Sequence, residues 1–372
     1  MNAASTPDPL AQLEGFLAQD PTNDGLRAEA FAAALRLGRR ERADAHLRAG
    51  LASGSDALGW RLRQAHWLMA QHDWPAAQAS LSALLQAQDA PSALINAVRQ
   101  DLALVALRSG RVDEGLACLA PLVDAAGLAL DPNAQALYLR LLHHAGRLDE
   151  LLLAAQRWAD TGRLGADATG VASLAALDAG QLGLCQAWAQ AALAQLPQQM
   201  EALVASASLA LGRQAAADAK ALLRVALQVN PQDGRAWSAW AFAEMLAGEL
   251  AAARSSFERA LQFMPEHIGT WHGLGWAALF LGDLDAAQSA FQQALALDRN
   301  FAESHGGLAV VHARRGDRAA ADAATEIALR LDRHCMSAHY ARAVLEGRAD
   351  DAAELQRLAS QLLIARRQRE GA

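Results

Sequence analysis

The feature that most constrains this chain is an internal repetition at a spacing of 34 residues. The stretch GRAWSAWAFAEMLAGELAAARSSFERALQFMPEH, which begins at Gly234, aligns without gaps with IGTWHGLGWAALFLGDLDAAQSAFQQALALDRNF, which begins at Ile268. Identical residues recur at equivalent positions: Trp237 and Trp271, Gly248 and Gly282, Ala253 and Ala287, Phe257 and Phe291, and Ala260 and Ala294. A period of this length predicts one supersecondary unit per copy, which buries its apolar face only by stacking on its neighbours.

The later of these two copies carries a recognisable residue pattern. Trp271, Leu274, Gly275, Gly282, Ala287, Phe291 and Ala294 together resemble the pattern of the tetratricopeptide repeat family, and Ala278 departs from it where the family usually has tyrosine. In a pair of antiparallel helices, the small residues let the backbones approach and the large residues fill the space between them. Gly282 allows the turn, and Asp283 is placed to cap the second helix. The resemblance implies an all-α fold, a right-handed superhelical solenoid of antiparallel helix pairs.

The same frame extends over nearly the whole chain. Upstream, the frame gives units near Met200, Ala166 and Pro132. The repeat frame then shifts twice and gives further units near Asn96, Leu58 and Asp24, and downstream it gives a unit from Ala302 to Cys335. Together these predict about nine repeats. We therefore expect an amino-terminal capping helix in 1–23, a solenoid over 24–335 with its strongest repeats in 200–335, and a helical cap in 336–372.

Composition agrees with an ordered, helical chain. Of its 372 residues, 53% are hydrophobic, and runs of the β-branched and aromatic residues that fill strands are missing. The formal net charge of -7 argues against general nucleic-acid binding and against binding to acidic lipid surfaces. No stretch is apolar over the length of a membrane span, and the first residues lack the pattern of a secretory signal. A cytoplasmic location is therefore expected.

The resemblance also implies where a partner binds. In this family the first helix of each pair lines a concave groove, which typically holds an extended peptide, a short helix or part of a partner domain. With the helix orientation that the resemblance implies, helical spacing predicts that six side chains of the two strongest repeats face this groove: Arg235, Phe242, Met245, His272, Trp276 and Phe280. Such an apolar, aromatic floor suits the apolar side chains of a peptide or an amphipathic helix. The alternative is that individual members pack against the adjacent helix.

Charged candidates for the groove are few. Arg140 and His143, with the neighbouring His144, form a secondary, basic candidate for contact with an acidic side chain, and a solvated helix face is the alternative. Some tetratricopeptide proteins grip a carboxyl-terminal carboxylate with lysines and asparagines on successive first helices. The only lysine, Lys220, falls on a second helix, so that kind of clamp is not expected here.

No catalytic, cofactor or metal site is predicted. The sequence has no nucleotide-binding, serine hydrolase or HExxH motif, and its glycines recur at the repeat turns. Cys118, Cys185 and Cys335 are far apart and form no pair with metal-binding or redox spacing. Histidines cluster toward the carboxyl end, but His305 stands where earlier repeats have tryptophan, which favours a packing role over metal binding.

These features predict a non-enzymatic protein-interaction module that binds a protein or peptide partner, an adaptor or scaffold in a bacterial-type multiprotein assembly. Two alternatives stay open: a dedicated chaperone or targeting factor for an apolar client in a secretion or envelope-assembly pathway, and a non-catalytic regulatory subunit of an enzyme complex such as a glycosyltransferase system. Self-association through terminal repeats is a further hypothesis, which the polar, arginine-ended final helix weakly opposes.

Overall fold

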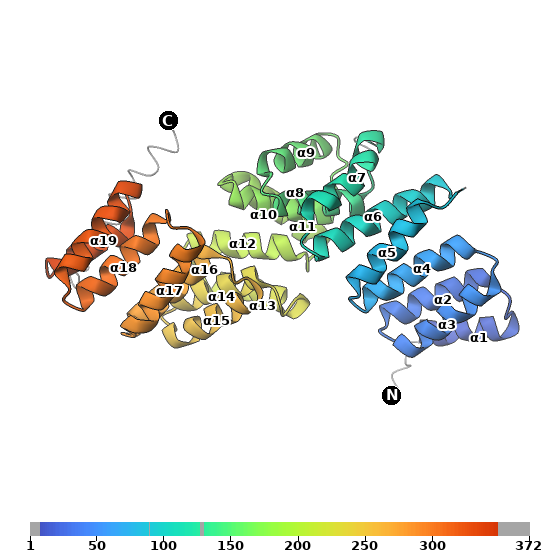
Figure 1. Cartoon of the computed structure of the whole chain (residues 1–372), viewed down its shortest axis with the longest axis horizontal. Coiled ribbons are helices and arrows are strands. Elements are labelled where there is room, and N and C mark those ends of the chain that lie inside the picture. Colours follow the sequence, from blue (N-terminus) through green and yellow to red (C-terminus); the bar gives the residue numbers. More distant parts are fainter. Residues whose placement is uncertain (1–7, 89, 127–129, 349–372) are drawn as a thin grey trace. The chain divides into compact units, whose positions relative to one another are not determined.

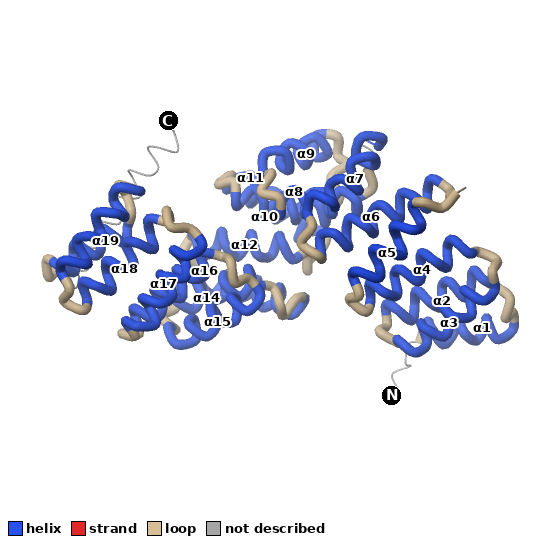
Figure 2. Tube along the Cα trace, viewed as in Figure 1, coloured by secondary structure: helices blue, strands red, loops and turns tan. Residues whose placement is uncertain are grey.

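The computed structural model describes residues 8–88, 90–126 and 130–348. Within these ranges every regular element is an α-helix (Figures 1 and 2). In the stretches 9–160 and 182–345, each helix packs against the next. The chain divides into an amino-terminal unit, Met1–Ala175, and a carboxyl-terminal unit, Ala176–Ala372. None of the helices in the described part combines the length and the apolar content that crossing a membrane requires.

The first ten helices belong to the amino-terminal unit, except that the division falls inside the tenth. They are α1 (Pro9–Gln19), α2 (Asp24–Arg36), α3 (Arg40–Ser53), α4 (Ala57–Ala70), α5 (Trp74–Leu85), α6 (Ser92–Arg108), α7 (Val112–Ala126), α8 (Pro132–His144), α9 (Leu148–Asp160) and α10 (Ala166–Asp178). The carboxyl-terminal unit continues with α11 (Leu182–Gln195), α12 (Met200–Gly212), α13 (Ala216–Val229), α14 (Gly234–Leu246), α15 (Leu250–Phe263), α16 (Ile268–Phe280), α17 (Leu284–Leu297), α18 (Ala302–Arg314), α19 (Arg318–Leu331) and α20 (Met336–Leu345).

These helices confirm the predicted all-α solenoid of stacked helix pairs. Counting from α2, nine pairs of first and second helices end with α18 and α19, which agrees with the predicted number of repeats. Predicted and observed starts coincide at Asp24, Pro132 and Met200. One start differs, because α6 begins at Ser92, directly after Pro91, and not near Asn96. The final helix predicted within 349–372 lies outside the residues that the structure describes, and the division into caps and solenoid stays a prediction.

In the repeat formed by α16 and α17, the turn between the helices follows from a glycine in the left-handed region and an acidic cap. Gly282 has a φ of 80°, and the backbone N–H of Asp283 donates to the carbonyl oxygen of Ala278 at 3.0 Å, which closes α16. The Asp283 carboxylate then accepts from the N–H of Ala286 at 3.0 Å and caps α17. His72 and Gln214 adopt the same positive φ without being glycine, so no residue type marked those two turns in advance.

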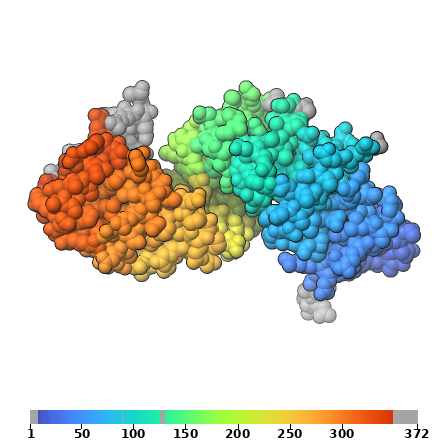
Figure 3. Space-filling view, viewed as in Figure 1, coloured from blue at the N-terminus to red at the C-terminus, as the bar shows by residue number. Residues whose placement is uncertain are grey.

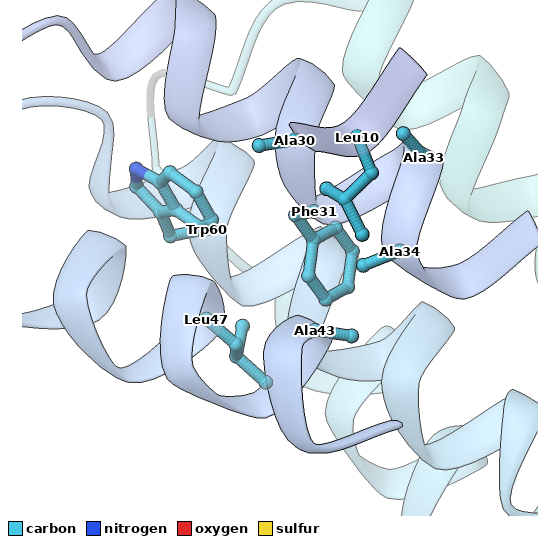
Figure 4. Packing of buried hydrophobic residues seen from close by; sticks show 8 residues of the cluster. All are labelled: Leu10, Ala30, Phe31, Ala33, Ala34, Ala43, Leu47 and Trp60. Atoms are coloured by element: carbon cyan, nitrogen blue, oxygen red, sulfur yellow. The ribbon is translucent and has the colours of Figure 1, made fainter. Parts of the chain in front are cut away.

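In the amino-terminal unit, the buried core combines leucines and alanines with a few large rings. Figure 4 shows one such cluster, in which the rings of Phe31 and Trp60 meet edge to face with centroids 6.4 Å apart. A Cβ added at Gly50 on α3 would lie 2.2 Å from the Trp60 ring. Glycine at that position is therefore what allows α3 and α4 to approach.

The carboxyl-terminal unit repeats this arrangement from one helix pair to the next. The side chain of Phe291 on α17 is fully buried, and a Cβ added at Gly275 on α16 or at Gly307 on α18 would lie 2.6 Å from its ring. Phe257 on α15 stands in the same relation to Gly273 on α16. A large ring in one repeat is thus matched by a glycine in the next. This close packing joins α16 to α19 into one continuous surface, orange to red in Figure 3.

Candidate functional site

The six predicted groove residues lie on two first helices of the carboxyl-terminal unit that contact each other. Arg235, Phe242 and Met245 belong to α14, and His272, Trp276 and Phe280 belong to α16. Phe242 and Phe280 are 38% and 52% exposed, whereas the other four are half-buried. The structure therefore brings the predicted set together on neighbouring helices. Partner binding by these residues stays a prediction.

Phe242 serves both the fold and the exposed surface. Its ring meets the buried ring of Phe257 edge to face, with centroids 4.9 Å apart, and its Cζ atom would lie 2.9 Å from a Cβ added at Gly273. Met245 packs beside the buried cluster that contains Phe257. The packing role that was the alternative for individual residues therefore applies in part to Phe242 and Met245.

Trp276 is the centre of an aromatic group on α16. Its ring centroid lies 5.4 Å from that of Phe280 and 5.9 Å from that of Tyr340, which belongs to α20. Its indole N–H donates to Nε2 of His272 at 3.0 Å. Trp276 is thus held in one orientation by a hydrogen bond, while Phe280 lies at the solvent side of the group.

His272 acts as an acceptor in this group. Burial lowers the pKa of His272 to about 4, against a smaller, opposing effect of the Glu303 carboxylate. The imidazole is therefore neutral at physiological pH, and its unprotonated Nε2 accepts the Trp276 N–H. Its ring centroid also lies 5.4 Å from that of Phe291 and 5.6 Å from that of Phe301. This environment fits a structural support for Trp276 better than a proton-transfer group.

Arg235 is engaged within the carboxyl-terminal unit. Its two terminal nitrogens lie 2.8 and 2.6 Å from the two carboxylate oxygens of Asp178. A partner carboxylate at Arg235 would therefore have to compete with an internal bidentate ion pair. Sequence reasoning had no means of seeing this contact, because the two residues are 57 positions apart.

The secondary candidates lie on α8, in the amino-terminal unit. Arg140 forms a bidentate ion pair with Asp167, at 3.0 and 2.8 Å, so a carboxylate of the chain itself already compensates its charge. The rings of His143 and His144 are 6.4 Å apart between centroids. Use of Arg140 and His143 by an acidic partner stays a prediction.

Sequence reasoning missed three further residues of this region, of which Tyr340 and Arg314 adjoin the aromatic group. Leu246, at the end of α14, is 43% exposed, and Arg314, at the end of α18, is exposed. Both occupy the register of Phe280, one repeat before and one repeat after it. Arg314 donates to the hydroxyl oxygen of Tyr340 at 3.1 Å. The repeat spacing was the signal that pointed to Leu246 and Arg314, whereas no sequence signal placed Tyr340 beside Trp276.

The histidine that replaces tryptophan in the later repeats keeps the role of the indole. In four successive first helices, a ring nitrogen lies within hydrogen-bond distance of the carbonyl oxygen six residues earlier. The pairs are Trp237 with Pro231, Trp271 with Pro265, His305 with Arg299 and His339 with Arg333, at 2.8, 2.7, 2.9 and 3.0 Å. The two histidines therefore hold the turn between repeats. Nowhere in the described ranges do three or more metal-ligating side chains gather.

The amino-terminal unit contains a pocket of about 330 Å³ that the sequence did not predict. Leu116, Ala117, Ala120 and Val123 of α7 line it together with Asp113, Asp124, Tyr138 and Arg147. Burial raises the pKa of Tyr138, so its hydroxyl stays protonated. Arg147 lies 2.6 Å from Glu150.

A family comparison agrees with the repeat pattern. The tetratricopeptide repeat model matches residues 232–300, which include α14 to α17 and all six predicted groove residues. No curated protein sequence matches the chain.

Three solved structures show similar helical arrangements. The human IFIT1 dimer with m7Gppp-AAAA has a TM-score of 0.54 at 15% identity, over 97% of this chain and 96% of that one. A crystal structure of MamA gives 0.37 at 17% identity, over 42% and 92%. The Cut9–Hcn1 hetero-tetramer of APC/C gives 0.44 at 14% identity, over 95% and 80%.

At these identities, the likeness to IFIT1 shows a shared fold and says nothing of a shared ligand, and the two lower scores add no further argument. The family assignment therefore depends on the sequence pattern of 232–300 together with the helix pairs that continue it in both directions. Residues 232–300 of this chain thus match the tetratricopeptide repeat family, and the described helices form an all-α solenoid.

Proposed function

We propose that the chain is a protein-interaction module that holds an apolar segment of a partner protein against α14 and α16, as an adaptor or scaffold in a bacterial-type multiprotein assembly. The observation that carries the proposal is the exposure of Leu246, Phe242 and Phe280 on neighbouring first helices, beside the half-buried Trp276. Exposed apolar side chains gathered in this way are typical of surfaces that bind apolar partners. Tetratricopeptide arrays are typically binding folds, and the proposal includes no catalytic step.

Two further roles use the same surface. A dedicated chaperone or targeting factor would shield an apolar segment of a single client in secretion or envelope assembly. A regulatory subunit would hold an enzyme, such as a glycosyltransferase, without contributing to its chemistry. The cytoplasmic location expected from the sequence belongs to all three versions. They differ in the partner, and the same experiment separates them.

The most informative variant combines Leu246→Ser with Phe280→Ser. Both side chains are exposed, and the ring contact of Phe280 is with Trp276, whereas Phe242 and Trp276 also support the buried core. Replacing Leu153 and Leu182 by serine provides the control, since these leucines are 54% and 55% exposed on the second helices α9 and α11. Circular dichroism must show unchanged helicity in both double variants.

Pull-down from the native cell extract, with quantitative mass spectrometry, then compares the wild type with the two double variants. We expect one partner to be depleted at least about tenfold with the Leu246 and Phe280 variant and to persist with the control. A folded partner in stoichiometric amount indicates a scaffold, an aggregation-prone client indicates a chaperone, and an enzyme indicates a regulatory subunit. Retention of every partner by the Leu246 and Phe280 variant would show that the groove assignment is wrong.

A further inference from the structure

The exposed apolar row of the carboxyl-terminal unit ends in a positive charge. Leu246, Phe280 and Arg314 occupy the same register at the ends of α14, α16 and α18, so consecutive repeats present an aliphatic, an aromatic and a cationic side chain. We call these three residues, with Trp276 and Tyr340, the mixed surface. Trp276 and Tyr340 lie beside the row, with ring centroids 5.9 Å apart.

The guanidinium of Arg314 has no carboxylate partner among the residues that the structure describes. It donates a hydrogen bond to the hydroxyl oxygen of Tyr340, at 3.1 Å. Neighbouring arginines differ, because Arg315 pairs with Asp285 and Arg330 with Glu326. An exposed guanidinium held by a neutral hydroxyl keeps its full charge and several free N–H donors.

The surroundings of Arg314 also differ in charge from the rest of the chain. Residues 302–348 contain seven arginines and six acidic residues, whereas the whole chain has a formal net charge of -7. Glu303, which acts electrostatically on His272, accepts hydrogen bonds from the backbone N–H groups of Met336 and Ser337, at 2.8 and 3.1 Å. An incoming carboxylate therefore meets an arginine that has no carboxylate partner among the described residues.

We propose that the mixed surface binds a partner segment that carries a large apolar side chain followed closely by an aspartate or glutamate side chain. The apolar side chain packs on Phe280 and Leu246, and the carboxylate accepts hydrogen bonds from the guanidinium of Arg314. Arginine and aromatic side chains together are enriched among the residues that dominate protein interfaces. Arginine recognises carboxylates with two parallel hydrogen bonds, which fixes the direction of the bound segment. This inference depends on the proposed function and adds the chemistry of the partner.

The test is a selection with the full chain. A displayed library of random peptides about twelve residues long is enriched on the immobilised protein, and enriched peptides are resynthesised with both ends blocked for fluorescence polarisation. We expect enriched sequences to place aspartate or glutamate within about four residues of a large apolar residue, one helical turn away. Changing that acid to its amide is expected to weaken binding about tenfold.

Variants of the protein locate the contact. Arg314→Gln is expected to weaken binding about tenfold, with no further loss when the peptide acid is also changed, because both changes remove one interaction. Arg314→Lys should retain part of the affinity, since the charge remains. Arg318→Gln is the matched control, because this arginine is largely exposed on α19 and lies outside the mixed surface.

The outcomes separate this inference from the proposed function. If peptides bind, and Phe280→Ser abolishes binding while Arg314→Gln does not change it, the groove function stands and the acidic requirement is wrong. Enrichment of peptides without acidic residues would likewise contradict the acidic requirement alone. If binding needs a free carboxyl terminus instead, the commitment to a side-chain carboxylate is wrong. A selection that enriches no sequence overturns both proposals.

Discussion

Replacing Gly307 by alanine tests how a ring in one repeat is matched by a glycine in the next. An added Cβ at Gly307 would lie 2.6 Å from both Cε1 and Cζ of Phe291, whose side chain is fully buried. Phe291 has little room to retreat, because a Cβ at Gly275 on α16 would meet its ring equally closely. Gly183 on α11 is the matched control, since a Cβ added there has no neighbour within 4 Å.

Two opposing effects set the size of the change in unfolding free energy. Crowding a well-packed core typically costs about 1–3 kcal/mol. Alanine is favoured over glycine inside a helix by about 1 kcal/mol. Because the Phe291 ring is confined on both sides, we expect crowding to dominate, with a net loss of about 1–2 kcal/mol for Gly307→Ala. Gly183→Ala should leave the protein unchanged or slightly more stable.

Phe291→Leu supplies the internal check, because leucine lacks the Cε1 and Cζ atoms that crowd an added Cβ. Urea unfolding followed by circular dichroism gives the midpoints of the two single variants and the double variant, with the slope checked because repeat arrays need not unfold in one step. We expect the double variant to lose at least about 1 kcal/mol less than the sum of the single losses. Equal effects of the two glycine variants, or simple additivity, would refute the reasoning.

Three further predictions concern side chains near the candidate site. Burial lowers the pKa of His272 to about 4, so the unfolded chain binds the proton more readily than the folded one. Lowering the pH from about 6.5 toward 4 is therefore expected to destabilise the wild type more than the His272→Gln variant, as measured by urea midpoints. Trp240→Phe removes the N–H that donates to Glu244 at 2.8 Å and leaves a buried carboxylate unpaired. This variant is expected to lower the unfolding free energy by about 1–3 kcal/mol, and an unchanged urea midpoint would contradict the expectation. His305→Phe removes the ring N–H and is expected to lower the free energy of unfolding by about 0.5–1.5 kcal/mol, whereas His305→Trp keeps a ring N–H and should not. Equal melting temperatures of the two variants would argue against the hydrogen bond to the carbonyl oxygen of Arg299.

The fold was predictable because the information is local and repeated. Gly248, Gly282 and Gly316 mark turns, because their positive φ values favour glycine. The spacing of these glycines in the sequence therefore predicts the helix pairs. His72 and Gln214 adopt the same backbone conformation, with φ values of 61° and 60°, although they are not glycine. No local rule predicts those positions, because the stacking of neighbouring repeats supplies the energy.

The candidate site was predictable only in part. The repeat register alone predicted that Phe242, Trp276 and Phe280 lie on first helices and face the same side, since side chains at equivalent positions share a face. Contacts between non-adjacent repeats were beyond that rule. The ion pair of Arg235 and the ring contact between Trp276 and Tyr340 depend on distances across the stack, which vary with the volume of the residues between them.

Repeats of this chain are not interchangeable modules, because the space for Phe291 is completed by a glycine of the following repeat. Consider a chimera in which the repeat beginning at Met200 follows the repeat that contains Phe291. Ala205 would then occupy the position of Gly307, and its methyl group would collide with the Phe291 ring. Tandem duplication of the repeat that begins at Gly234 faces a similar mismatch, because Ala239 would take the position of Gly273 beside Phe257. The segment best suited for copying by duplication is therefore the whole repeat that begins at Ile268, because it carries Gly273 and Gly275 together with Phe291.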